Sequence, residues 1–472
     1  MKLDSKKIIL VGLAFFLISI FWQVYDVTIP KILMYKFGYN HTISGIIMAL
    51  DNILALTLLP LFGALSDRTN HKLGRRTPYI IVGTLIAAFA FIGLTFSDNY
   101  QLKLIEEAGV IETVEDMEAA LPEGQVLTEA QLIQIRTAAW DVTIENPVNI
   151  IVFSGILLIV LIAMSTFRSP AVALMPDITV KPLRSKANAI INLMGGASGA
   201  IALVLMMILG TDSSRFANNT VLFLIVALLM LTSLGIFLWK VREPKLVKQM
   251  EEDKIRYGIV DEIDEGTSNK LQKEQLTSLI LILLSIFLWF MGYNAVTSKF
   301  SIYAKDQLNM GATLPLLIAN TAAILAYIPA GIVSTKIGRK KTIMGGVILM
   351  TLSFGSAFFL TPSSNYLMYA VLLLAGVGWA SINVNSYPMI AELSKGSNVG
   401  KYTGYYYTFS MSAQAITPVL SGFLMDRLGL LTLFPYATVF IFLAFFTMMM
   451  VKHGNAKPIP TKEKLGYLGV ED

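Results

Sequence analysis

The chain contains no cysteine and only three histidines, His41, His71 and His453, which stand far apart. Without cysteine there is no disulfide, no thiolate nucleophile and no Cys-ligated metal site. The sequence also has no nucleotide-binding signature of the form G-x-x-x-x-G-K-[ST], which argues against an ATP-driven pump. No nucleophile–base pair stands out. We therefore expect neither an enzyme nor a protein that holds a metal or an organic cofactor.

Charge is scarce as well. Charged residues make up 15% of the 472 residues and hydrophobic residues 55%, whereas a soluble domain carries about 25% charged residues. The apolar stretches repeatedly reach the roughly 20 residues that a helix needs to cross a bilayer. The composition therefore predicts an all-α integral membrane protein whose partner is the lipid bilayer. The net charge of +5 is attributed to cytoplasmic loops and not to nucleic-acid binding.

Twelve apolar segments are candidate membrane spans. They cover residues 8–30, 42–66, 78–97, 148–175, 187–210, 219–239, 278–302, 312–335, 343–361, 365–391, 402–425 and 432–451. The first resembles a signal peptide, but its apolar run continues to Ile29 without a small-residue cleavage site, so we interpret it as a retained helix.

Basic residues are distributed unequally between the two sets of loops. With the N-terminus inside, cytoplasmic segments hold 28 Lys and Arg. Outer segments hold 8, counting Lys299, which lies near the outer end of its span and is expected to reach toward the headgroups, and Arg168 remains within a span. Because membrane proteins keep basic loops inside, this predicts a multi-pass protein of the cell (plasma or inner) membrane with both termini cytoplasmic.

Two long loops divide the chain. We expect an N-terminal six-helix bundle over 1–240 with an extracellular insertion at 98–147, a cytoplasmic linker at 241–277, a C-terminal six-helix bundle over 278–451 and a cytoplasmic tail at 452–472. Helical patterning around 103–120 and 128–140 predicts a small cap, which either gates access or is a solvated insertion. Two such halves with a binding site between them recur in transporters, and we expect a monomer.

A glycine-rich cationic motif follows the second span. It reads Gly63-Ala-Leu-Ser-Asp67-Arg68, then Gly74-Arg75-Arg76, and a looser copy with Gly331, Gly338, Arg339 and Lys340 follows the eighth span, where Thr335 replaces the acid. We interpret these residues as a gating motif. Asp67 is expected to face the positive N-terminus of a neighbouring helix, and the arginines to pair with acids across the two halves. Topology-setting positive charge alone would explain the basic residues but not Asp67 or the spaced glycines.

These motifs resemble the loop motif of the major facilitator superfamily, and the resemblance covers essentially the whole chain. A narrower likeness is to the sucrose/proton symporters, through Ser66-Asp67-Arg68, Gly74-Arg75-Arg76-Thr-Pro78-Tyr79 and the spacing of Pro170 and Asp177. Pro60-Leu-Phe-Gly63 is shared with the glycoside–pentoside–hexuronide cation symporters. Val172 stands where the sucrose branch has Arg, and Ala55 and Leu59 stand where the cation symporters have acids.

The resemblance implies secondary active transport, with a proton as the coupling ion and a sugar as the small-molecule substrate. A di- or oligosaccharide or a glycoside fits best. The alternatives are sodium-coupled sugar symport and a carrier or exporter of a drug-like, lipid or organic-anion solute.

Four ionisable residues are candidates for proton coupling: Asp177, Asp51, Asp26 and Arg168. Charged groups at membrane depth are costly and normally face a cavity. Asp177 with Arg168 is the leading pair, with Asp177 as the proton acceptor, and Asp51 with Arg168 is a possible interhelix ion pair. The competing interpretations place Asp177 among basic residues at the cytoplasmic surface and Asp26 at the outer headgroups.

Aromatic and amide side chains within the spans are candidates for sugar binding, because aromatic rings pack on C–H faces while amides and acids bond hydroxyl groups. The candidates are Trp22, Gln23, Asp26, Asn52, Trp289, Tyr293, Asn294, Asn320, Trp379, Asn383, Asn385 and Gln414. Taken singly, each is as easily explained by helix packing, since polar groups inside a membrane must find partners.

Overall fold

The computed structural model describes residues 4–122, 125–180, 184–212, 214–256, 273–393 and 399–454, and in these ranges the regular structure is helical. The helices of the first half are α1 (Ser5–Lys31), α2 (His41–Arg68), α3 (Thr77–Glu107), α4 (Val110–Ala119), α5 (Glu129–Glu145), α6 (Pro147–Ile178), α7 (Arg184–Ile208) and α8 (Thr220–Lys240). Those that follow are α9 (Glu243–Arg256), α10 (Lys273–Leu308), α11 (Thr313–Ile337), α12 (Arg339–Ala357), α13 (Leu367–Leu393), α14 (Val399–Leu428) and α15 (Leu433–Met450).

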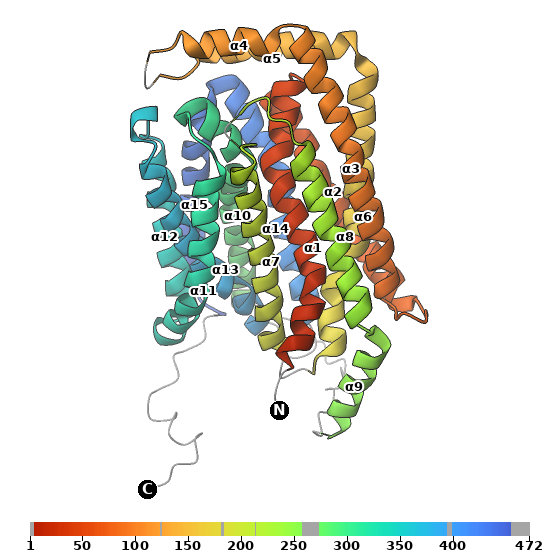
Figure 1. Ribbon diagram of the computed structural model, residues 1–472. Coiled ribbons are helices and arrows are strands. Elements are labelled where there is room, and N and C mark those ends of the chain that lie inside the picture. The colour runs from red at the N-terminus through yellow and green to blue at the C-terminus, as the bar shows by residue number, and fades with distance from the viewer. Residues whose placement is uncertain are drawn as a thin grey trace.

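Twelve of these helices lie at the twelve predicted span positions and form one bundle (Figure 1). Among the described residues, ten are long and apolar enough to cross a membrane. The other two are α12, which opens on Arg339-Lys340-Lys341, and α14, which carries several tyrosines and hydroxyl residues. Figure 1 shows both helices beside the other spans of the bundle.

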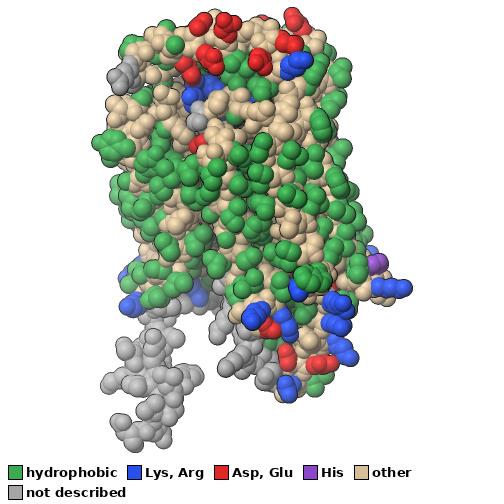
Figure 2. All heavy atoms as spheres, in the orientation of Figure 1, with side chains coloured by type: hydrophobic (Ala, Val, Ile, Leu, Met, Phe, Trp, Pro, Cys, Tyr) green, Lys and Arg blue, Asp and Glu red, His purple; other side chains and the backbone are tan. Residues whose placement is uncertain are grey.

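The bundle has two distinct ends. The start of α1, the end of α15 and α9 lie at one end, the terminal end, whereas α4 and α5 run across the opposite end, the insertion end (Figure 1). Hydrophobic side chains cover the middle of the visible face, basic side chains gather at the terminal end and acidic ones at the insertion end (Figure 2). This belt is what a lipid-facing surface requires.

Buried apolar side chains form two large cores. One draws on residues between Val11 and Val241, and the other on residues between Leu279 and Val451. Each half thus packs around its own interior. The second core also takes in residues of the insertion, among them Leu132 and Ile135 of α5.

The insertion grows out of α3, which continues ten residues beyond the predicted end of its span, to Glu107. The reason is a buried polar layer. Asp98 accepts a hydrogen bond from Lys36 at 2.6 Å, and both side chains are only 1% exposed. Gln101 donates to Thr143 Oγ1 at 3.0 Å and so ties α3 to α5. These polar contacts lie beyond the apolar run of α3, and they stabilise the extended part of the helix by joining it to neighbouring segments.

Candidate functional site

Two acids and one arginine share the interior of the first half. Asp26 lies on α1, Asp51 on α2 and Arg168 on α6, and Arg168 interacts electrostatically with both carboxylates. Asn52 donates to Asp51 at 2.7 Å. The guanidinium of Arg168 lies 5.7 Å from the ring centre of Trp22, within range of a cation–π interaction.

Aromatic side chains of the second half lie opposite this charged group. Tyr293 of α10 stacks on Trp379 of α13 with ring centres 3.8 Å apart and planes 3° from parallel, and Phe290 meets the same indole edge-on at 5.3 Å. Tyr293 interacts electrostatically with Asp26, so the two groups face each other across the halves. Asn383, on α13, shares a hydrogen bond with Tyr327 of α11.

Two predicted amides meet at the packing surface of α7. A Cβ at Gly199 would lie 3.3 Å from Gln23 Oε1 and 3.5 Å from Asn320 Nδ2, so both amides border the space that this glycine leaves open. Asn320 donates to the carbonyl of Gly196 at 3.4 Å. Gln23, from the first half, and Asn320, from the second, are thereby brought together.

Other predicted binding residues make local contacts instead. Trp289 is fully buried in the core of the second half. The amides of Asn294, Asn385 and Gln414 donate to carbonyls four residues earlier on their own helices, at 2.7, 2.8 and 3.3 Å. In this conformation the three amides find their hydrogen-bond partners within their own helices. This agrees with the helix-packing alternative given in the sequence analysis.

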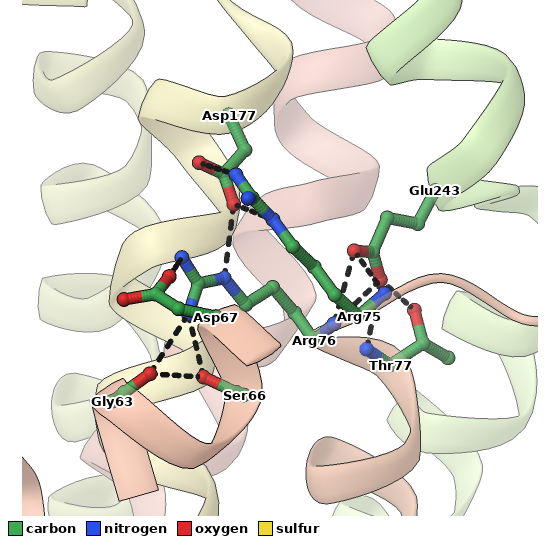
Figure 3. Close-up of polar contacts among 8 residues, drawn as sticks. All are labelled: Gly63, Ser66, Asp67, Arg75, Arg76, Thr77, Asp177 and Glu243. Atoms are coloured by element: carbon green, nitrogen blue, oxygen red, sulfur yellow. Dashed lines mark hydrogen bonds and ion pairs between the residues drawn. The ribbon is translucent and has the colours of Figure 1, made fainter. Parts of the chain in front are cut away.

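The cationic motif folds into a network at the terminal end (Figure 3). Asp177, at the end of α6, pairs with Arg75 at 2.7 Å and accepts from Arg76 Nε at 2.9 Å. Arg76 also pairs with Asp67 and donates to Ser66 Oγ at 2.5 Å. The sequence predicts that Asp177 pairs with Arg168. In the structure Asp177 instead pairs with Arg75 and Arg76.

The partners of both arginines come from the first half, whereas acids across the halves were expected. The side chain of Asp67 remains 57% exposed. In this conformation the motif ties α2, α3 and α6 together and leaves Asp67 open to solvent.

Glu243 is a member of this network that sequence reasoning missed. Its carboxylate accepts from the backbone N–H groups of Arg75 at 2.8 Å, Arg76 at 3.0 Å and Thr77 at 2.8 Å, and from Thr77 Oγ1 at 2.7 Å (Figure 3). It thus fills the N-terminus of α3, where orphan N–H groups favour an acid. The region had been interpreted as a linker, and an acid beside Pro244 at the start of a helix was the available signal.

Gly74 explains why the carboxylate fits. Its φ of +108° is in the left-handed region that favours glycine, and a Cβ there would collide with Glu243. The second glycine of the motif is thus required both for the turn and for the acid.

In the second copy of the motif, the partners of the basic residues include backbone carbonyls. Gly338, with φ of +93°, separates α11 from α12. Arg339 donates to the carbonyl of Pro388 at 3.4 Å, and Lys340 donates to those of Met449 and Val451, both at 2.7 Å. Gly331 packs near Val384 of α13. With Thr335 in place of the acid, the basic residues hold helix ends.

The fold and the motif define a membrane transporter. The pattern of the Major Facilitator Superfamily matches residues 138–325 and 312–466, and the chain belongs to this family. It is a transporter and not an enzyme.

Several solved transporters share the fold. The inward-open xylose transporter XylE from E. coli is 14% identical, with 98% of this chain and 99% of that one covered and a TM-score of 0.63. A bacterial homologue of the iron transporter ferroportin, in an inward-facing state, is 14% identical over 95% and 99% with a TM-score of 0.62. A D-xylose-proton symporter is 14% identical over 96% and 99% with a TM-score of 0.61.

Among curated proteins, the MFS-type transporter ppzB of Metarhizium rileyi (strain RCEF 4871) is 28% identical over 120 residues. The match spans 25% of this chain and 24% of that relative.

Proposed function

We propose that the protein is a proton-coupled symporter of a sugar, with a di- or oligosaccharide or a glycoside as substrate. The observation that carries the proposal is the juxtaposition of Asp26, Asp51 and Arg168 with the stacked pair Tyr293 and Trp379. The acids and the arginine supply coupling, and the aromatic pair supplies a platform for a sugar ring.

The charge count favours a cation as the coupling species. Two carboxylates and one guanidinium in the membrane interior carry one uncompensated negative charge, and such a charge is costly unless it is neutralised. One proton removes it. Asp177, in contrast, already faces two guanidinium groups at the terminal end. We therefore assign coupling to Asp26 and Asp51 and assign Asp177 to the network that holds the helix ends.

The aromatic side favours a sugar over a multivalent anion. Trp379 and Tyr293 offer extended ring faces without charge, and Arg168 is the sole basic side chain beside the two acids that the sequence places mid-span. The sucrose/proton symporter motifs support the same substrate class. Two proteins of similar fold are a xylose transporter and a D-xylose-proton symporter, which agrees with the proposal.

Uptake of radiolabelled sucrose, maltose and aromatic β-glycosides into vesicles tests the function. An inward proton gradient should raise accumulation of at least one sugar, and a sodium gradient at constant pH should not. If only the sodium gradient stimulated uptake, sodium would be the coupling ion in place of the proton. Absence of sugar uptake under every gradient would overturn the sugar proposal.

The coupling assignment is tested by two matched variants. Asp51→Asn should abolish gradient-driven accumulation and leave sugar exchange intact, because the proton site is lost while the binding site stays. Asp177→Asn should slow both accumulation and exchange, because it weakens the network with Arg75 and Arg76, and both processes require the helices in that network to move. The reverse pattern would return coupling to Asp177.

The aromatic platform is tested through Trp379→Ala. Loss of a stacked aromatic pair should raise KM for the sugar roughly three- to tenfold, with little change in maximal rate. The control is Trp239→Ala, since Trp239 is 72% exposed on α8, far from the pair in sequence. Equal effects of the two substitutions would remove Trp379 from the binding site.

A further inference from the structure

The two halves meet most closely at the insertion end, through α2 and α14. The first residues of α2, His41 and Thr42, contact Asp426 in the last turn of α14, so the two helices run in opposite directions. The end of α14 therefore lies beside the beginning of α2. A contact at one end of this pair joins the halves there and leaves the other end free to separate.

Both helices finish on the same pattern. α2 ends in Gly63-Ala-Leu-Ser-Asp67-Arg68, and α14 ends in Gly422-Phe-Leu-Met-Asp426-Arg427. The gating motif thus has a counterpart at the opposite end of the bundle, on the helix that partners α2. The sequence comparison of the two halves missed it because α14 is not the equivalent of α2 in chain order.

Asp426 closes this end by capping α2. Its two carboxylate oxygens accept from the backbone N–H groups of His41 at 2.9 Å and Thr42 at 2.7 Å. The side chain of Asn40, the residue that caps α2 from within its own sequence, accepts from the N–H of Ile43 at 2.8 Å. Asp426 thereby satisfies N–H groups that the first turn of a helix leaves unpaired, and its charge is favoured by the positive end of the helix.

Two glycines permit the close approach. A Cβ at Gly45 would overlap the backbone of Pro418, and one at Gly422 would overlap the carbonyl of His41. Lys299, on α10, donates to the same carbonyl at 3.0 Å and is fully buried. The sequence had suggested that Lys299 reaches toward the headgroups, whereas it holds the start of α2 from the second half.

The insertion adds a basic residue behind the cap. Arg136 of α5 lies 4.0 Å from Asp426 and 3.6 Å from Glu129, and its side chain is largely buried. Leu132 and Ile135, on the same helix, belong to the core of the second half. The insertion, although part of the first half of the chain, is therefore bound to the second half at the point where Asp426 acts.

We propose that Asp426 and Arg136 are gating residues of the transport cycle, and that they form an outer latch whose opening admits substrate at the insertion end. Asp426 joins α14 to α2, and Arg136 holds the carboxylate in place. In this conformation the outer latch is closed, while Asp67, the matching acid at the other end of the pair, is exposed and bonded to Arg76. The two acids close opposite ends in alternation.

A second ionic group also joins the insertion to the second half. Arg215 pairs with Asp306 of α10 at 2.8 Å and with Glu118 of α4, and Glu118 also lies 3.8 Å from Lys305. This group is not independent of the latch, because Glu129 interacts electrostatically with Arg136, Asp306 and Asp426. The reference for additivity is therefore a residue outside both groups, and Glu115, exposed on α4, meets this requirement.

The absence of cysteine makes the test direct. Ser44 is buried one turn inside α2, beneath the latch, so Ser44→Cys in the purified protein in nanodiscs should react slowly with a water-soluble maleimide. Adding Asp426→Asn should raise the labelling rate about fivefold, the order expected from the loss of one helix cap. Arg136→Gln should raise it less, and Arg136→Lys should restore the slow rate.

The controls separate gating from simple loosening. Glu115→Gln, an exposed acid on α4, should leave the rate unchanged. Asp426→Asn combined with Arg136→Gln should act less than additively, whereas Asp426→Asn combined with Glu115→Gln should match Asp426→Asn alone. A labelling rate within twofold of the parent in a monodisperse Asp426→Asn protein overturns the proposal, and so does strict additivity with Arg136→Gln. No substrate is involved, so the result is independent of the proposed sugar transport.

Discussion

Acidic side chains in this chain differ in role according to their surroundings. Asp177 faces two guanidinium groups, Glu243 faces four N–H and O–H donors, and Asp51 shares one arginine with a second acid. The first two are matched by their partners and hold structure. The third belongs to a group with a charge left over, which is the arrangement that a coupling site requires.

Glu243 offers the sharpest stability prediction at the residue scale. Glu243→Gln removes the negative charge from the N-terminus of α3 and weakens its bonds to three N–H groups, which should cost about 1–2 kcal/mol. The apparent melting midpoint in detergent should therefore fall. Glu252→Gln, on the exposed side of the same helix, is the control and should leave the midpoint unchanged. Equal midpoints for both variants would contradict a capping role.

A single helix carries enough signal to place neighbouring side chains. Trp22 and Asp26, four apart on one span, both lie near Arg168, whereas the stacking of Tyr293 on Trp379 joins two helices and was not predicted. Interpretation of the sequence did not find Glu243 or Asp426, because each acts on the start of a helix far away in the chain. A carboxylate's partner at such a distance is set by packing, which a single sequence does not display.

At the element scale, small residues decide how closely helices approach. Gly345 and Gly346 are neighbours on α12 with opposite surroundings. A Cβ at Gly346 would lie 2.7 Å from the carbonyl oxygen of Gly378 on α13, whereas one at Gly345 meets nothing within 4 Å. Close backbone approach of this kind is a common means of association between membrane helices.

This neighbouring pair allows a matched prediction. Gly346→Val should destabilise the second half by roughly 1–3 kcal/mol through overpacking against α13, while Gly345→Val, with the same change in helix propensity, should have little effect. Thermal unfolding followed by tryptophan fluorescence compares the two. A loss of stability in the Gly345 variant as large as in the Gly346 variant would show that helix propensity, and not packing, dominates.

The helices themselves were well predicted, because long apolar runs signal a span directly. The positions at which the helices end were predicted less well. α3 extends past its apolar run through the buried pair of Lys36 and Asp98, and α9 (Glu243–Arg256) is a charged helix within what was expected to be a linker. Polar contacts can extend a helix beyond its apolar run, so a hydrophobicity pattern alone does not predict where the helix ends.

At the scale of the whole molecule, the chain has two large cores, and its halves meet where α2 packs on α14 and where α7 packs on α11. The halves are also joined at the insertion end by Asp426, Lys299 and Arg215. Binding at the interface between the halves is the arrangement that alternating access needs. Which end faces the cytoplasm determines the side of the membrane on which the latch at Asp426 opens.

The orientation follows from charge and can be measured. The start of α1, the end of α15, α9 and a gathering of basic side chains share one end of the bundle (Figures 1 and 2), and basic loops are retained in the cytoplasm. The insertion end should therefore face outward. Because the chain has no cysteine, Glu115→Cys on α4 and Glu252→Cys on α9 report the two ends separately. A membrane-impermeant maleimide should label only the first in intact cells and both after permeabilisation. Labelling of Glu252→Cys alone in intact cells would invert the topology, and with it the assignment of the latch at Asp426 to the outer side.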